Sequence, residues 1–303
     1  MKMNQSVSLM TFNALWHRGP ENEKHPWSER MKITENVILK YEPDIICFQE
    51  LLVKQINDLF PSSVIPRGRG ESLSQYAVTG PFDKNGNLSS RGNSGNQGIH
   101  IFYNKEKFEL KLKNSRFRTP GINNFRRPTV WAHFRTKKHS NKELLIFNCH
   151  LDWNSPKAER SKVAEMLWDE TQKRIEETEL PAFILGDFNS SRNEQTWEIL
   201  TGRNGDNEGF ADAQVIMALN NGVINSEIAE SGAKIDETIK MHTRLKTTCH
   251  DFRGIEQTEF LEYIDWILYM VAKAEIVHFE IVEYNEDGLY PSDHYPVFAE
   301  FLI

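Results

Sequence analysis

Six short stretches of the sequence carry side chains that can bind a metal ion or move a proton. Each stretch ends, lies in, or immediately precedes an apolar run of the kind that forms a β-strand. The side chains are carboxylates, carboxamides and imidazoles, a combination typical of a hydrolytic site around a hard divalent cation. In chain order they are Asn13, Gln49 with Glu50, His150, Asp187 with Asn189, Asp265, and Asp293 with His294.

Oxygen atoms dominate this donor set, and the donor type indicates the ion. Converging carboxylates repel one another unless a cation holds them, and oxygen ligands suit Mg²⁺ or Mn²⁺ better than Zn²⁺. Two histidines beside such an ion indicate proton transfer or binding of a charged transition state. Taken singly, Glu50 also reads as an acid at a helix N-terminus, and residues 292–294 as an Asx turn. The placement of all six stretches beside strand ends favours a site.

The spacing of apolar residues predicts the elements that position these groups. One helix is expected over Trp27–Tyr41, and a second opens at Ser155–Pro156, as cap and first residue, and runs to about Thr178. The second helix joins two strands and so predicts a crossover between parallel neighbours. The predicted strands are Val7–Phe12, Asp44–Phe48, Ile99–Tyr103, Thr129–Phe134, Leu144–Cys149, Ala182–Leu185, Glu262–Tyr269, Glu275–Val282 and Val297–Leu302.

The order of these elements predicts a mixed α/β sandwich. Strands that follow each other directly, as from Glu262 to Val282, are expected to pair antiparallel. Pro61–Gly98 and Gly202–Thr248 are poorly patterned, and we expect long loops there near the mouth of the site. No stretch resembles a linker or a repeat, so residues 1–303 are expected to form one domain.

Composition narrows the classes of function. The chain has 303 residues, of which 39% are hydrophobic and 26% charged, so a disordered or fibrous protein is excluded. No apolar run approaches the ~20 residues of a membrane span, and the first residues lack the apolar region of a signal peptide. Three cysteines, an odd number, favour free thiols in a reducing compartment. We therefore expect a cytoplasmic protein with no membrane partner.

The charge is distributed unevenly along the chain. The net charge of −7 predicts no general attraction to polyanions, yet Lys105–Lys142 carries twelve Lys and Arg residues against two Glu. This segment is either a solvated strand pair with basic loops or a patch that receives a phosphorylated substrate. The guanidinium candidates for contacts to distal phosphates are Arg91, Arg116 and Arg126. Trp16, Trp153 and Trp197 either stack on a base or sugar or belong to the core.

The ordered motifs TFN, QE, NCHLD, GDFN, IDWIL and SDHYPV resemble those of the endonuclease/exonuclease/phosphatase superfamily over essentially the whole chain. The resemblance implies a four-layer α/β sandwich, with two mainly antiparallel β-sheets packed face to face and helices outside. It also implies hydrolysis of a phosphate ester by in-line attack of water, dependent on Mg²⁺ with Mn²⁺ as a substitute.

The resemblance further implies a role for each motif residue. Glu50 would be the principal metal ligand, helped by Asn13 and Asp293. The remaining motif residues would act on the water and the phosphate: Asp187 and Asn189 orient both, His294 with Asp265 behind it contacts the phosphate or serves as base, and His150 is the second histidine. Whether Asp187 or His294 takes the proton from water stays open.

Two positions qualify these roles. Many family members carry a Glu where this chain has Gln97, and an amide cannot stabilise the cation of His150. His150 is then either neutral or supported by another carboxylate such as Asp152. His250, in the motif TTCHDF, corresponds to a histidine common in bacterial members and is either a substrate ligand or a structural residue.

Three functions follow from the sequence, in order of preference. The first is hydrolysis of a phosphodiester in a nucleic acid or nucleotide, and the second is hydrolysis of a small phosphorylated metabolite. The inositol-phosphatase branch is disfavoured, because it has an Arg where Trp266 follows Asp265. The third, a non-catalytic binding module, is disfavoured because the full set of motif residues is present. No protein partner is inferred.

Overall fold

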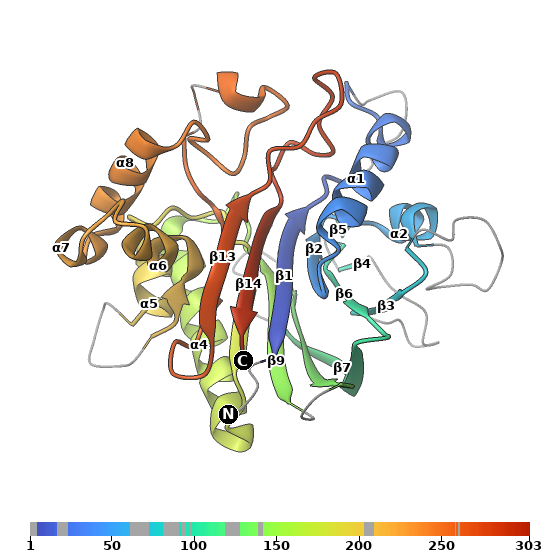
Figure 1. The fold of residues 1–303 in the computed structure, drawn as a ribbon, viewed down its shortest axis with the longest axis horizontal. Coiled ribbons are helices and arrows are strands. Elements are labelled where there is room, and N and C mark those ends of the chain that lie inside the picture. Colours follow the sequence, from blue (N-terminus) through green and yellow to red (C-terminus); the bar gives the residue numbers. More distant parts are fainter. Residues whose placement is uncertain are drawn as a thin grey trace.

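Two β-sheets of six strands each lie face to face in the computed structural model, which describes residues 5–16, 24–60, 73–80, 91–92, 95–96, 98–118, 128–138, 142–202, 209–257, 259 and 261–303. The first sheet has the strand order β13-β14-β1-β2-β6-β3. Its strands are β1 (Ser6–Asn13), β2 (Ile45–Gln49), β3 (Tyr76–Thr79), β6 (His100–Asn104), β13 (Glu275–Ile281) and β14 (Val297–Leu302). Figure 1 shows β13, β14 and β1 side by side in front of β9.

The second sheet has the order β11-β12-β10-β9-β8-β7. Its strands are β7 (Phe108–Arg118), β8 (Pro128–Thr136), β9 (Glu143–His150), β10 (Ala182–Asp187), β11 (Ala211–Asp212) and β12 (Asp265–Tyr269). A separate ribbon pairs β4 (Arg91–Gly92) with β5 (Gly95–Asn96). Each six-stranded sheet contains one parallel pair, β1–β2 and β9–β10, among antiparallel neighbours. The predicted mainly antiparallel sandwich is therefore confirmed.

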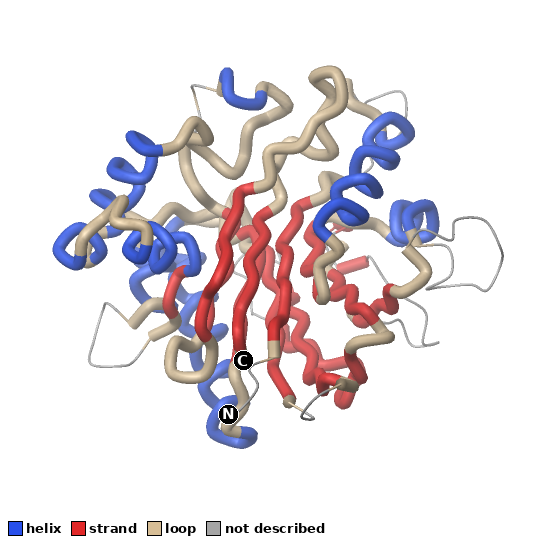
Figure 2. The backbone as a smooth tube through the Cα atoms, in the orientation of Figure 1, coloured by secondary structure: helices blue, strands red, loops and turns tan. Residues whose placement is uncertain are grey.

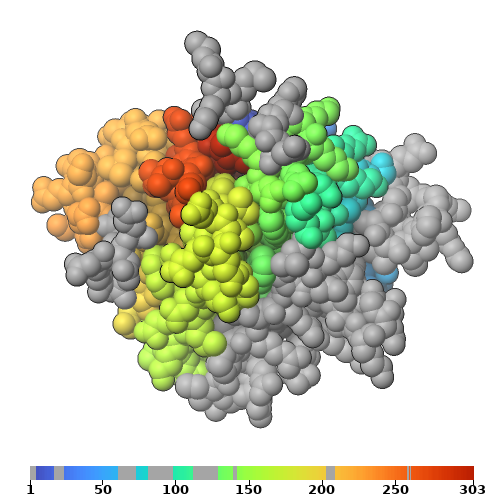
Figure 3. All heavy atoms as spheres, turned by 90° about the horizontal axis from the view of Figure 1, so that it is seen from below, coloured from blue at the N-terminus to red at the C-terminus, as the bar shows by residue number. Residues whose placement is uncertain are grey.

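Helices lie outside the two sheets and leave part of the outer face of the first sheet, at β13, exposed (Figure 2). They are α1 (Trp27–Tyr41), α2 (Val53–Leu59), α4 (Lys157–Thr178), α5 (Gln195–Leu200), α6 (Ala213–Asn220), α7 (Ser226–Ala229) and α8 (Gly232–His242), with a 3-10 turn at Gly254–Glu256. The view from below shows α4, in yellow-green, on the surface between the orange α6–α8 region and green residues of the second sheet (Figure 3). No helix in the described ranges is long and apolar enough to cross a membrane.

Three apolar clusters correspond to the three interfaces of the four layers. Strand residues such as Leu9 and Ile146 fill the space between the two sheets. Phe48 and Trp27 belong to a cluster beneath α1 and α2, whereas Trp197 and Leu167 belong to one beneath the helices on the second sheet. Alternate residues of a strand point to opposite faces, so each sheet supplies two of these interfaces. Of the two roles predicted for Trp197, stacking on a substrate or packing in the core, the structure shows the second.

The predicted crossover between β9 and β10 is confirmed, but the expected start of its helix is wrong. Ala182 to Asp187 pair in parallel register with Leu145 to His150, with α4 between the strands. The cap of α4 is Pro156, not Ser155, and no side chain caps the helix. Ser155 instead turns back, with its Oγ 3.4 Å from Asp152 Oδ2.

The expectation that the strands between Glu262 and Val282 pair with each other is also wrong. The first of them begins at Asp265, and β12 belongs to the second sheet whereas β13 belongs to the first. A turn in which Lys273 N and Ala274 N both donate to Met270 O carries the chain across. Direct succession along the chain therefore does not imply pairing when a short turn can span two packed sheets.

Much of Gly202–Thr248, expected to be a loop, is helical in the described residues. Its helices α6, α7 and α8 pack on the second sheet through apolar residues such as Val215 and Ile235. The fully buried Arg192 links α6 and α8, because its guanidinium pairs with Asp212, the cap of α6, and with Asp236 of α8, at 2.8 and 2.7 Å. In the other predicted loop, Pro61–Gly98, the strand β3 forms, and most of the rest lies outside the described residues.

Candidate active site

Both sheets bring polar strand ends to one shared edge. In the second sheet Asp187, the last residue of β10, pairs with His150 on one side and with Asp265 on the other. In the first sheet Asn13 ends β1 opposite Gln49. Because β14 runs antiparallel to β1, the residues that precede β14, Asp293 and His294, come to the same end. This is the upper end of β1 and β14 in Figure 1.

The carboxylate of Asp187 is the centre of this cluster. Its Oδ2 accepts a hydrogen bond from Asn13 Nδ2 at 2.9 Å, across the two sheets. The same oxygen lies 3.3 Å from His150 Nε2 and 4.0 Å from His294 Nε2. The other oxygen, Oδ1, accepts from the backbone N–H of Asn189 at 2.9 Å. One carboxylate thus faces residues from three distant motifs, in addition to Asn189 of its own motif.

The pKa of Asp187 responds to these neighbours. Burial alone raises it, because the charged form loses its solvation. The interactions with His150 and His294, followed by the hydrogen bond from Asn13, outweigh burial and hold the pKa of Asp187 below its usual value. The carboxylate is therefore ionised at neutral pH and is an acceptor for a proton or a ligand for a cation.

His294 and Asp265 form a buried hydrogen-bonded pair. His294 Nδ1 lies 2.9 Å from Asp265 Oδ2, and both side chains are almost fully excluded from solvent. Burial lowers the pKa of His294, but contacts with Cys249 and Asp265 raise it well above its usual value overall. Burial raises the pKa of Asp265, and His294 partly offsets that rise. The pair holds Nε2 of His294 toward Asp187.

Glu50 and Asn189 both have left-handed backbone conformations, with φ of 59° and 46°. Such conformations cost about 1–3 kcal/mol for residues other than glycine and are concentrated at functional sites. Glu50 Oε2 accepts from Trp16 N at 3.3 Å, and its Oε1 lies 3.9 Å from His150 Nε2. Asn189 Nδ2 donates to Leu151 O at 2.8 Å. The sharp bends therefore aim both side chains at the shared edge.

His150 faces carboxylates on one side only. Its Nε2 is directed at Asp187 and Glu50, whereas the buried Nδ1 has no hydrogen-bond partner among the described residues. Gln97 lies outside the described residues. The Asp152 carboxylate accepts from Asn154 N at 3.2 Å within the turn that follows β9.

Asp293 lies beside Asn13 through a shared serine. Ser292 Oγ donates to Asn13 O at 2.7 Å and lies 3.1 Å from Asp293 Oδ1. Arg30 supports the same loops, because its buried guanidinium donates to the carbonyls of Ala14 and Pro291 at 2.8 and 3.0 Å. Ser292 lies in the quoted motif SDHYPV, but the motifs alone indicate no supporting role for either Ser292 or Arg30 at this site.

Two groups of possible metal ligands lie at this edge. Among the described residues, ligating atoms of Asp187, Asp265 and His294 lie within 4.8 Å of one another. We do not assign this trio to a metal, because the hydrogen bond between His294 and Asp265 already occupies two of its three groups. Asn13, Glu50 and Asp293 offer one amide and two carboxylates, the donors that a hard divalent ion prefers. Their chemistry fits Mg²⁺ or Mn²⁺.

Of the residues predicted to bind substrate, the structure describes the side chain of His250 but not those of the three arginines. His250 is fully buried, its ring lies 4.0 Å from that of Tyr295, and its Nδ1 accepts from Gly254 N at 3.3 Å. Burial lowers the pKa of His250 to about 3, so the ring is neutral. The side chains of Arg91 and Arg116, and the whole of Arg126, lie outside the described residues.

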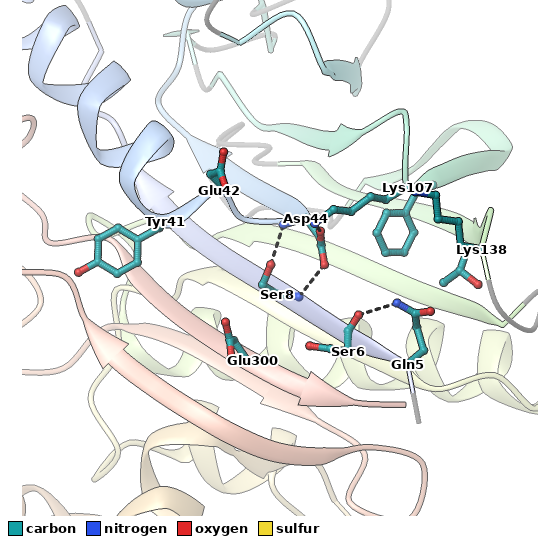
Figure 4. Close-up of a pocket in the computed structure, with 11 residues that line it drawn as sticks. Gln5, Ser6, Ser8, Tyr41, Glu42, Asp44, Lys107, Lys138 and Glu300 are labelled. Carbon is teal, nitrogen blue, oxygen red and sulfur yellow. Dashed lines mark hydrogen bonds and ion pairs between the residues drawn. The ribbon is translucent and has the colours of Figure 1, made fainter. Parts of the chain in front are cut away.

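The basic segment is divided between the two ends of the sandwich. By register, Arg116 pairs with Val130, which pairs with Asn148, two residues before His150. Lys107 instead lies at the opposite end, where it pairs with Asp44 at 2.5 Å in a pocket of about 440 Å³ (Figure 4). Ser6 lines that pocket, about 23 Å from Asn13 at the usual rise of a strand. Only the Arg116 end of the segment therefore lies toward the site.

Several known proteins resemble this chain in sequence or in fold. Protein angel of Drosophila melanogaster is 26% identical over 199 residues, which cover 64% of this chain and 52% of that protein, so the match spans about half the length of this relative. An endonuclease/exonuclease/phosphatase family protein from Bacteroides thetaiotaomicron shares the fold, with a TM-score of 0.73 and 20% identity over 100% of this chain and 97% of its own. A mannosyl-6-phosphatase from the same organism also shares it, with a TM-score of 0.70 and 19% identity over 98% of this chain and 100% of its own.

The motif residues at the shared edge are spread over nearly the whole of the chain. The model of the Endonuclease/Exonuclease/phosphatase family matches residues 10–294, which span every motif from Asn13 to His294. Members of this family are phosphoesterases, and the chain belongs to the endonuclease/exonuclease/phosphatase family.

Proposed function

We propose that this protein is a metal-dependent phosphodiesterase that cleaves its substrate by in-line attack of water. The observation that carries the proposal is the position of the Asp187 carboxylate, in contact with Asn13, His150 and the His294 side of the site. A phosphoryl transition state spreads negative charge over its oxygens, so a site that joins an ionised acceptor to two imidazoles suits it. Membership of the family supports the reaction class.

Glu50, with Asn13 and Asp293, would hold the divalent ion, which we propose to be Mg²⁺ with Mn²⁺ as a substitute. When bound, the ion neutralises charge on the phosphate and polarises its phosphorus–oxygen bonds. The backbone bend at Glu50, the bond from Asn13 Nδ2 to Asp187 and the contact of Ser292 Oγ with Asp293 Oδ1 support these three side chains. Such preorganisation limits the cost of reorganisation in the transition state.

Asp187 would accept the proton from the attacking water, and Asn189 would help to orient the water and the phosphate. The hydrogen bond from Asn189 N fixes Oδ1 of Asp187, so Oδ2 is the oxygen that faces the histidines. His294 would bind the phosphate as a cation, because Asp265 behind it favours the charged ring. His150 would donate a hydrogen bond to the phosphate through Nε2.

A phosphodiester in a nucleic acid or nucleotide is the substrate class that we propose. The basic strand β7 supports this substrate class. By register, its residue Arg116 lies at the end of the second sheet where His150 also lies. Trp153, which follows His150 by three residues, is 65% exposed, and an exposed indole can stack on a base. The three cysteines are free, which supports a reducing compartment such as the cytoplasm.

Hydrolysis of a small phosphorylated metabolite is the second candidate. It is supported by the likeness in fold to a mannosyl-6-phosphatase. A fold alone hosts many activities, so this likeness ranks below the residues at the site.

A substrate panel tests these proposals directly. It compares a chromogenic monoester, a chromogenic diester, single-stranded RNA and DNA, and duplex DNA, each with Mg²⁺, Mn²⁺ or EDTA, and uses Asp187→Ala as the control. We expect metal-dependent cleavage of diesters that the control lacks. Hydrolysis of the monoester alone would reverse the ranking of the two candidates, and the absence of metal-dependent turnover on every substrate would leave only a binding module.

A further inference from the structure

The motif TTCHDF, which the roles above do not use, forms a strap across the back of the site. We define the strap as residues Thr247–Asp251. Its Thr248 N donates to Glu262 O at 3.2 Å, near the start of β12, and Tyr295 N donates to Thr248 O at 2.8 Å. The strap therefore lies between the strand that carries Asp265 and the loop that carries His294.

Successive residues of the strap contact successive members of the site. The backbone N–H groups of His250 and Asp251 donate to Asp293 O at 2.7 and 3.1 Å. Cys249 forms an isolated antiparallel bridge with His294, and its thiol contacts the His294 ring. The strap thus contacts both Asp293, a proposed metal ligand, and His294, the histidine proposed to bind the phosphate.

Thr248 contacts a third residue of the site, Asp265. Its Oγ1 is buried and accepts from Ile264 N at 3.0 Å and from Asp265 N at 3.1 Å. These two bonds fix the backbone at Asp265, whose Oδ2 is the atom that holds His294. Asp265 Oδ1 has no hydrogen-bond partner among the described residues.

The last residue of the strap and the residues that follow it have strained backbone conformations. Asp251 and Phe252 have φ of 47° and 58°, and Gly254 has a φ of 61°. A Cβ on Gly254 would lie 2.0 Å from Tyr290 Oη, so this position needs glycine on two counts. The Phe252 ring stacks on His25 at 4.0 Å. A strained segment persists only where its surroundings over-determine it, which indicates that the strap is fixed in place.

We infer that Thr248 is a positioning residue for the reaction. Its hydroxyl fixes the backbone at Asp265, and through it the carboxylate that orients the ring of His294. The inference rests on the proposed function, because it gives Asp265 and His294 their roles. Thr247 differs from Thr248 in this respect. The Thr247 hydroxyl contacts backbone carbonyl groups and not the backbone of Asp265. Its Oγ1 lies 2.8 Å from Cys249 O, within the strap, and 2.8 Å from Glu262 O, which precedes β12.

Loss of the hydroxyl from Thr248 is therefore expected to lower kcat by displacing Asp265, with little change in KM. Substitution of a residue that acts through another is non-additive with substitution of that other residue. With bis(p-nitrophenyl) phosphate and Mg²⁺, we expect Thr248→Val to lower kcat about tenfold or more, and Thr248→Ser to restore it to within about threefold of the parent. In the Asp265→Asn background, Thr248→Val should lower kcat by less than about twofold.

The controls separate positioning from stability. Thr171→Val removes an equally buried hydroxyl, which donates to Leu167 O in α4 far from the site, and should leave kcat unchanged. Melting temperatures of all variants show which of them fold, and Thr248→Ala repeats the double-variant comparison if Thr248→Val does not fold.

Two results overturn the inference about Thr248: a full multiplicative loss in the Asp265→Asn background, or a Thr248→Val variant as active as Thr171→Val. A different result would show that the proposed function itself is wrong: turnover that persists in EDTA or in the Asp187→Ala variant. In that case the positioning role fails with it.

Discussion

Asn13 Nδ2 lies 2.9 Å from Asp187 Oδ2, and this hydrogen bond joins the end of β1 in the first sheet to the end of β10 in the second. The two residues are separated by 174 positions in the chain. The bond is buried, so its loss would leave the Asn13 amide group without this partner, at a cost of about 1–3 kcal/mol. The packing of the two sheets therefore decides where the Asp187 carboxylate points.

Removal of the Asp187 carboxylate or the His294 ring is expected to abolish most activity. Asp187→Ala and His294→Ala should each lower kcat/KM at least ~100-fold, because each removes a group that acts in the transition state. The measurement is the rate with a chromogenic diester at saturating Mg²⁺. Asp169→Ala, on the exposed side of α4, and His278→Ala, at the half-exposed edge strand β13, serve as controls. A loss smaller than tenfold in either site variant contradicts the assignment.

Removal of the metal is expected to abolish turnover and to lower stability together. A ligand present at 100 times its Kd stabilises the folded state by about 2.7 kcal/mol, so Mg²⁺ should raise the melting temperature by a few degrees relative to EDTA. Glu50→Gln should lose both effects, because an amide is a weaker ligand than a carboxylate. Glu106→Gln, an exposed residue in the turn between β6 and β7, is the matched control. An unchanged Mg²⁺-induced shift in Glu50→Gln would exclude Glu50 as the principal ligand.

Stability is expected to fall in mild acid because of the buried His100. Burial lowers the pKa of His100 from 6.5 to about 3, so the folded state holds the ring neutral while the unfolded chain takes up a proton. The stabilising contribution is complete above pH 6.5 and is lost as the pH falls toward 3. Between pH 7 and pH 5 it changes by about 2 kcal/mol.

The test of this pH effect is urea unfolding of the parent and of His100→Leu at pH 7 and pH 5. The apolar variant lacks the titrating group, so its free energy of unfolding should drop less than that of the parent. His278→Leu, in the exposed part of β13, should follow the parent. Equal slopes for His100→Leu and the parent would show that His100 is protonated in the folded state.

Arg192 is expected to matter for stability and not for chemistry. Its guanidinium neutralises Asp212 and Asp236 and donates to Gln214 Oε1 at 2.9 Å, all in the buried interior. Arg192→Met would leave two buried carboxylates without their cation, which costs about 3–5 kcal/mol.

Urea unfolding and the specific activity of the folded fraction measure this separation. Lys32→Met removes a surface ion pair to Glu35 and should cost less than about 1 kcal/mol. An Arg192→Met variant as stable as Lys32→Met would contradict the structural role, whereas a loss of activity in the folded fraction would place Arg192 in the site.

The amino-acid sequence by itself determined the residue types at the ends of strands and the alternation that makes those strands. Short-range patterns carry this information, because burial on a sheet face repeats every second residue. For this reason the strands that end at His150 and Asp187, and the crossover between them, were predictable. The motif order from Asn13 to His294 was sufficient to predict the family and the fold class.

The tertiary structure alone decided which groups meet. No local pattern separates β12 from β13 into different sheets, because both are apolar strands and the turn between them fits either arrangement. The strap at Thr247–Asp251 has the composition of an ordinary loop, and its importance comes from hydrogen bonds to residues 14 to 47 positions away. Such contacts form only when the whole chain has packed, since they join backbone groups that any residue type provides.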